Sequence, residues 1–168
     1  MKKQVLLLIS FSILTIITCN EVGTTYDQLI AIKTVSQRVS DLKKTKIEIK
    51  NSEDPIALVR EEHQFLEYEY PVRKDESYVI FYRFDDTGCF EIKLDTYLNN
   101  QIDAQKVINL IIKDLEVNTT FGLPKKSSNF YRWENLNSEI LIELDVQNIK
   151  RGHISLNIFS TIFNNLKI

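Results

Sequence analysis

Apolar residues recur at intervals of three and four in two segments of the chain, a spacing that predicts two amphipathic helices. The first helix is expected to begin near Thr25, because residues 25–28 fit a capping box. Its buried face would carry Leu29, Ile32, Val35, Val39 and Leu42. The second is expected to begin with Asp103 as its cap and to end before Gly122 and Pro124. Its buried face would carry Ala104, Val107, Ile108, Ile111, Ile112 and Leu115.

Elsewhere apolar and polar residues alternate, which is the period of a β-strand. The predicted strands cover 46–50, 64–70, 127–133, 140–146 and 154–158. The last two have one apolar and one polar face, which is typical of an antiparallel sheet covered on one side. Runs of strands interrupted by single helices predict an α+β fold, in which two helices pack mainly on one face of an antiparallel sheet.

Residues 78–94 predict a hairpin with a defined register. A three-residue loop, 86–88, would place Gly88 in the left-handed conformation. The apolar face would then pair Phe84 with Phe90, Tyr82 with Ile92, and Ile80 with Leu94. The other face would pair Arg83 with Glu91 and Phe81 with Lys93. A loop of two or four residues would set apolar residues opposite charged ones. The register leaves Val79 and Phe81 on the less apolar face, where a further element covers them or they form a small exposed patch.

After Met1 the chain has two lysines, then an apolar run over residues 5–17 and a cysteine at position 19. This run of 13 residues is shorter than the ~20 that a membrane-spanning helix requires. It therefore predicts an export signal rather than a membrane anchor. Residues 16–19, Ile-Ile-Thr-Cys, resemble the processing site of bacterial lipoprotein precursors, with Thr18 where that family prefers Gly, Ala or Ser.

This resemblance implies that residues 1–18 are a signal peptide and that Cys19 is acylated after cleavage. The acyl chains would hold the protein on a bacterial membrane, with its domain in the periplasm or outside the cell. We therefore expect a lipidated cysteine and short tether over 19–25 and a single globular domain over 26–168.

Charge and cysteine content narrow the class of protein further. Loss of residues 1–18 removes two of the 21 Lys and Arg residues and leaves 23 Asp and Glu, so the net charge becomes about −4. No basic face is visible, and no nucleic-acid partner is expected. With Cys19 lipidated, Cys89 would be the only thiol and could form no intramolecular disulfide. Stability must then come from the hydrophobic core.

Cys89 is the only candidate nucleophile of unusual chemistry, and it would need His63 or His153 nearby to form a thiolate. The expected register places Cys89 opposite Asp85, and a carboxylate raises the pKa of a thiol. Cys89 is therefore interpreted as a strand residue next to a turn. The run Glu61, Glu62 and His63 offers too few ligands for a metal site, so no metal or cofactor is expected.

Several carboxylates surround the hairpin: Asp85, Asp86, Glu91 and Asp95. Paired carboxylates can hydrolyse glycosidic bonds at fixed separations. Here Glu91 is expected to pair with Arg83, and the two turn aspartates to bond to the backbone. No catalytic residue is assigned to the chain.

Aromatic residues are the remaining feature of the sequence that can indicate a binding site. Tyr131 and Trp133 are expected on one face of a strand, and Phe81 on the less apolar face of the hairpin. Each can belong to the core or to a binding patch, since Tyr and Trp are enriched in recognition sites.

The leading hypothesis is a non-enzymatic, membrane-anchored lipoprotein that binds a protein partner, as an assembly factor or an inhibitor of the immunity type. The alternative is a binder of small ligands or glycans through the aromatic residues. A third hypothesis, a cell-wall or thiol-dependent enzyme, requires a reactive Cys89.

Overall fold

The computed structural model describes residues 34–117, 121–135 and 139–160. Within these ranges the helices are α2 (Val35–Val39), α3 (Lys46–Ser52) and α4 (Gln101–Val117), with 3-10 turns η1 (Pro55–Ala57) and η2 (Ile149–Arg151). The strands are β1 (Leu58–Glu62), β2 (Phe65–Arg73), β3 (Glu76–Asp85), β4 (Gly88–Tyr97), β5 (Lys125–Lys126), β6 (Phe130–Asn135), β7 (Ile140–Asp145) and β8 (His153–Ser160). The expected signal peptide, Cys19 and tether lie outside the described residues.

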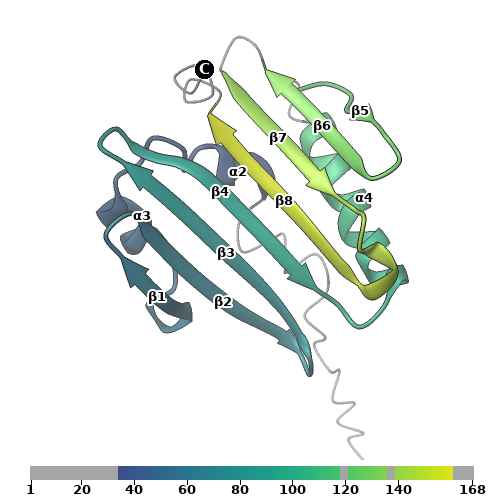
Figure 1. Cartoon of the computed structure of the whole chain (residues 1–168), viewed down its shortest axis with the longest axis horizontal. Helices are drawn as coiled ribbons and strands as arrows, with labels where there is room; N and C mark the ends of the chain where they lie inside the picture. Colours follow the sequence, from purple (N-terminus) through teal and green to yellow (C-terminus); the bar gives the residue numbers. More distant parts are fainter. Residues whose placement is uncertain (1–33, 118–120, 136–138, 161–168) are drawn as a thin grey trace, which may run out of the picture.

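The strands form one antiparallel sheet in the order β1-β2-β3-β4-β8-β7-β6-β5. It consists of two four-stranded meanders, β1–β4 and β5–β8, joined where β4 pairs with β8. The helices α2, α3 and α4 lie on the same side of this sheet (Figure 1). The predicted α+β class is confirmed. None of the helices in the described part of the chain is long and apolar enough to cross a membrane.

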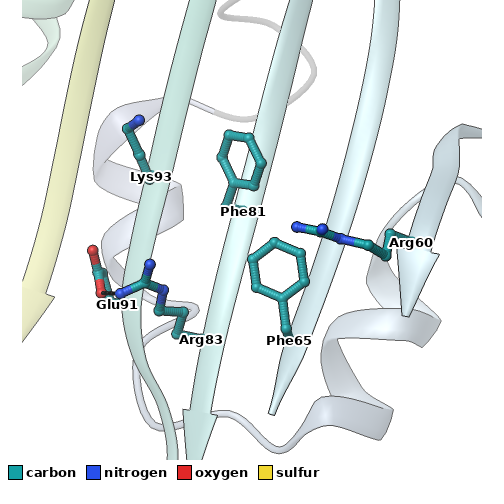
Figure 2. Close-up of a pocket in the computed structure, with 6 residues that line it drawn as sticks. All are labelled: Arg60, Phe65, Phe81, Arg83, Glu91 and Lys93. Atoms are coloured by element: carbon teal, nitrogen blue, oxygen red, sulfur yellow. Dashed lines mark hydrogen bonds and ion pairs between the residues drawn. The ribbon is translucent and has the colours of Figure 1, made fainter. Parts of the chain in front are cut away.

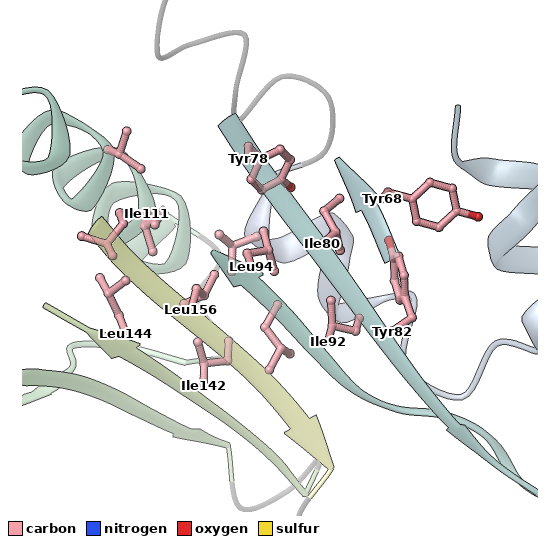
Figure 3. Packing of buried hydrophobic residues seen from close by; sticks show 14 of the residues in the cluster. Tyr68, Tyr78, Ile80, Tyr82, Ile92, Leu94, Ile111, Ile142, Leu144 and Leu156 are labelled. Atoms are coloured by element: carbon pink, nitrogen blue, oxygen red, sulfur yellow. The ribbon is translucent and has the colours of Figure 1, made fainter. Parts of the chain in front are cut away.

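The core lies between the sheet and the helices. One row of directly paired residues crosses six strands and is fully buried: Leu66, Tyr82, Ile92, Ile158, Ile142 and Trp133. The apolar face predicted for the second helix packs against it from α4, with Ile111 above β8 (Figure 3). The alternation in β2–β4 and β6–β8 thus places every second side chain in this core.

The predicted hairpin register is confirmed over most of its length, since Ile80 pairs with Leu94 and Tyr82 with Ile92. The predicted pairing of Phe84 with Phe90 is wrong. A bulge in β4 shifts the register there, so that Phe84 pairs with Cys89.

The cause of this shift is a segment that is distant from the hairpin in sequence but hydrogen-bonded to it in space. The Lys43 amide donates to the Cys89 carbonyl at 2.7 Å, and the Cys89 amide donates to the Lys44 carbonyl at 2.8 Å. Gly88 has a φ of 121°, and a Cβ on it would lie 2.4 Å from the Lys43 carbonyl oxygen. The conformation of the hairpin loop is therefore set both by its own turn and by its close contact with residues 43–44.

The strand predicted over 46–50 is wrong, because these residues form α3. Thr45 caps this helix, and Glu48 completes a capping box. Ile49 is buried, whereas Ile47 is 71% exposed, so the two isoleucines do not share a face as they would in a strand. In a helix, residues two apart point in different directions.

The first predicted helix is only partly described. Leu29, Ile32 and the Thr25 capping box lie outside the described residues. Within them α2 covers only 35–39, capped by Thr34, and Val35 and Leu42 are buried as predicted. The second predicted helix begins at Gln101 rather than after Asp103, since the Asn100 side chain accepts the Asp103 amide at 2.9 Å.

A buried polar cluster fixes α2 and the end of α3 to the sheet. The Arg38 guanidinium is fully buried; it donates to Glu53 at 2.6 Å and also to the Tyr82 hydroxyl. The Tyr70 and Tyr82 hydroxyls donate to the same carboxylate at 2.7 and 2.9 Å. Burial opposes the charge on Arg38, but Tyr78, Tyr82 and Glu53 hold its pKa above the usual range. One carboxylate thereby connects both helices to β2 and β3.

Candidate functional site

The face of the sheet opposite the helices, here called the open face, carries the polar half of each alternating strand. One row of paired residues crosses it from β2 to β5: Glu67, Phe81, Lys93, Asn157, Glu143, Arg132 and Lys125. Val79 and Phe81 lie on this face, as the hairpin register predicted. None of the three described helices covers it (Figure 1).

A pocket of about 180 Å³ lies on the open face over β1–β4 (Figure 2). Its lining combines aromatic and charged side chains: Arg60, Phe65, Phe81, Arg83, Glu91 and Lys93. We call it the open-face pocket. It is the candidate functional site, because it joins partly exposed aromatic rings with several cations.

Two phenylalanines form the apolar part of the pocket. The ring centroids of Phe65 and Phe81 are 5.9 Å apart. The Arg60 guanidinium lies 4.4 Å from the Phe65 ring centroid, and the Lys93 ammonium 5.7 Å from that of Phe81. Both distances fall within the range of cation–π attraction, which keeps the cations close to the rings.

Ion pairs hold the charged side chains of the pocket in place. Arg83 Nη1 lies 3.1 Å from Glu91, which confirms the pairing predicted for them. Lys93 Nζ lies 2.7 Å from Asp95, and Arg60 Nε lies 3.1 Å from Glu67. The cations are half-exposed, so each pair contributes little to stability, and their main effect is to orient the side chains.

The structure separates the three aromatic residues predicted as a binding patch. Tyr131 and Trp133 stack with ring centroids 6.3 Å apart, but Trp133 is 1% exposed and belongs to the core row. Phe81 lies on the opposite face of the sheet, in the open-face pocket. Trp133 is therefore placed to report on the packing of the core, whereas Phe81 lies partly exposed on the open face.

Sequence reasoning missed Arg60 and Phe65 as members of this site. Phe65 belongs to the predicted strand 64–70, but pairing this strand with 78–84 was needed to bring it next to Phe81. The short gap between these two predicted strands, residues 71–77, was the available signal. In the structure, Arg73 and Glu76 within this gap form an ion pair of 2.6 Å. Arg60 lies in β1, whose sequence has only Leu58 and Val59 as apolar residues.

Cys89 lies in the core next to the hairpin turn. Burial, with smaller effects from Asp41 and other carboxylates, raises its pKa to about 12. It pairs with Phe84, and not with Asp85 as predicted. His153 pairs with Tyr97 at the far end of β4, and because a strand rises about 3.4 Å per residue, it lies more than ~20 Å from Cys89. His63 is exposed in the turn after β1.

Three of the hairpin carboxylates, Asp85, Glu91 and Asp95, have the partners expected of structural residues. Asp85 accepts the Thr87 amide and hydroxyl, both at 2.7 Å. Asp95 is buried between Lys93 and His153, whose Nε2 lies 3.5 Å away. In the described part of the chain, no three His, Cys, Asp or Glu side chains are grouped to hold a metal ion.

Comparisons of the chain with protein-family models, with curated proteins and with solved structures find no match. The functional argument therefore depends on the geometry of the open face.

Proposed function

We propose that the protein is a lipid-anchored envelope protein that binds a protein partner through the open face of its sheet, without catalysing a reaction. The anchor would be Cys19, by the resemblance of residues 1–20 to lipoprotein signals. The partner would cover the open-face pocket, and the role would be that of an assembly factor or an inhibitor.

The observation that carries this proposal is the size and lining of the pocket. Pockets that enclose small-molecule ligands have volumes of roughly 300–1000 Å³. The open-face pocket has about 180 Å³, and a cavity of about 150 Å³ holds a benzene ring. Its volume thus suits one side chain of a partner. This favours protein binding over the alternative of a small ligand or glycan.

The composition of the pocket supports the same conclusion. Interfaces are enriched in aromatic residues and arginine, and a few such residues supply most of the binding energy. Phe65, Phe81, Arg60 and Arg83 meet within one site on a face that the three described helices leave uncovered. The pocket is large enough for an anchor side chain, and the polar rows around it suit the rim of an interface.

Site-specific photocrosslinking of the full chain in living cells tests this proposal. A benzoylphenylalanine at Asn157 would face the partner, whereas one at Lys113, exposed on α4, would point away from the open face. We expect one major protein adduct from position 157 and none of that mass from position 113. Phe81→Ser should abolish the adduct, and Ile102→Ser, a change at an exposed apolar residue of α4, should leave it intact.

The outcomes separate the possible functions. An adduct from position 113 alone, or one that Phe81→Ser does not reduce, would contradict binding at the open face. A small molecule retained by the purified chain, with no protein adduct, would favour the ligand-binding alternative.

The anchor has its own test. Cys19→Ala should move the protein out of the membrane fraction and remove incorporated palmitate. Membrane retention of this variant would contradict the lipoprotein assignment.

A further inference from the structure

Arg60 presents unused hydrogen-bond donors at the edge of the open-face pocket. Its Nε lies 3.1 Å from Glu67 and 3.8 Å from Glu62. Among the described residues, none forms a hydrogen bond with its two terminal Nη groups, and the ion-pair distances of Arg60 are those of its Nε. Figure 2 shows the guanidinium end of Arg60 extending toward Phe65 and Phe81.

Two contacts orient this guanidinium before any partner binds. Its Cζ lies 4.4 Å from the Phe65 ring centroid, within the range of cation–π attraction, and its Nε lies next to Glu67. The free edge of an arginine is a planar fork that matches the two oxygens of a carboxylate. An arginine oriented in this way loses less conformational entropy on binding an anion than a free side chain does.

We propose that Arg60 binds a side-chain carboxylate of the protein partner, next to an apolar side chain that fills the space beside Phe65 and Phe81. This inference rests on the proposed function and specifies the partner's chemistry: a Glu or Asp adjacent to an aromatic or large aliphatic residue. The planar guanidinium of Arg60 would bind the carboxylate, and the apolar neighbour would fill the pocket as the anchor side chain.

Each cation of the pocket has a carboxylate neighbour, so the free hydrogen-bond donors of the cations, rather than an excess of positive charge, favour an acidic segment over a basic or neutral one. The lining has three cations, Arg60, Arg83 and Lys93, and one carboxylate, Glu91. Glu91 is engaged by Arg83, which uses a single Nη1 contact for it. Lys93 has one carboxylate partner, Asp95. An incoming carboxylate therefore meets unused donors, whereas an incoming cation would compete with existing ion pairs.

Two peptides with blocked termini test the inference on the full-length chain in detergent micelles. One has glutamate on both sides of a phenylalanine, and the other has glutamine in those positions. Fluorescence anisotropy gives the affinity of each. Because a charge-assisted bidentate pair is stronger than a neutral contact, we expect the glutamate peptide to bind about tenfold more tightly. The blocked termini exclude a contribution from a terminal carboxylate.

Variants test whether Arg60 is the residue that causes the preference for the glutamate peptide. Arg60→Gln should remove the difference between the peptides, and Arg60→Lys should restore only part of it, since an ammonium lacks the planar fork. Lys113→Gln, on α4, should leave the difference unchanged. The Arg60 side chain is 54% exposed, so its loss will not unfold the protein.

Equal affinity for the two peptides, binding of neither, or a preference that survives Arg60→Gln would overturn the inference. The proposed function and this inference can be distinguished by experiment. If position 157 still crosslinks a protein in a Phe81-dependent manner while the peptides show no preference, the partner binds the open face by other chemistry.

Discussion

Phe81 and Tyr82 are consecutive in β3, yet they serve opposite faces of the sheet. Phe81 lines the open-face pocket, whereas the Tyr82 hydroxyl donates to Glu53 at 2.9 Å beneath the helices. This separation follows from the period of two in a strand. It lets a single strand contribute to both the core and the candidate binding site.

The first prediction compares these two neighbours. Tyr82→Ala should lower the free energy of unfolding by about 3–5 kcal/mol, because it removes a fully buried ring. Phe81→Ala should cost less than half as much, because Phe81 is partly exposed. Urea denaturation of both variants, followed by the fluorescence of the single, buried Trp133, measures this difference. Equal losses would show that the open face is packed like a core.

The second prediction concerns the buried Arg38–Glu53 pair. Arg38→Ala leaves the Glu53 carboxylate buried without its cation, and should destabilise the protein by about 3–5 kcal/mol. The double variant Arg38→Met with Glu53→Gln removes both charges and should recover most of this loss. The same denaturation assay applies. A double variant no more stable than Arg38→Ala would mean that hydrogen bonds to the tyrosines, rather than the unpaired charge, determine the cost.

The spacing of apolar residues was enough to predict the α+β class, the buried stripe of α4 from its three- and four-residue intervals, and from alternation the strands that became β2–β4 and β6–β8. These elements have strong periods, and tertiary packing reinforces them. Predictions for short segments were less reliable. Residues 46–50 contain only two isoleucines, so alternation could not distinguish a strand from α3, and the Thr45–Glu48 capping box was the better signal.

The candidate site was harder to predict, because it depends on pairing between strands. Phe81 was correctly assigned to the less apolar face, but Arg60 and Phe65 join it only through the β1–β2 and β2–β3 registers. The β4–β8 pairing joins residues about sixty positions apart, and no local pattern encodes it. Trp133 was ambiguous for the same reason, since the row that buries it crosses six strands.

The third prediction concerns two glycines in left-handed conformations. Gly152 has a φ of 76°, and a Cβ on it would lie 1.9 Å from the Leu98 carbonyl oxygen. Gly122 has a φ of 66°, and apart from its chain neighbours no described residue has an atom within 4 Å of the same position. Gly152→Ala should therefore destabilise the protein by several kcal/mol, because backbone must move, whereas Gly122→Ala should cost only about 1 kcal/mol of conformational strain.

Thermal unfolding of the two glycine variants gives the comparison. A similar fall in Tm for both would show that the approach of Leu98 to Gly152 is not rigid, and that the conformational term alone sets the cost.

The fourth prediction concerns the Cys89 thiol, and it also tests the thiol-enzyme hypothesis. Burial raises its pKa to about 12 from an ordinary value of 9.0, so almost no thiolate exists near neutral pH. In the Cys19→Ala variant, where Cys89 is the sole thiol, iodoacetamide should react slowly at pH 7–9 and rapidly once urea unfolds the chain. Because the folded state favours the protonated thiol, Cys89 contributes stability below pH 9 that is lost progressively between pH 9 and 12. Labelling as fast in the folded protein as in urea would show an exposed, activated thiol, and would return an enzymatic role for Cys89 to consideration.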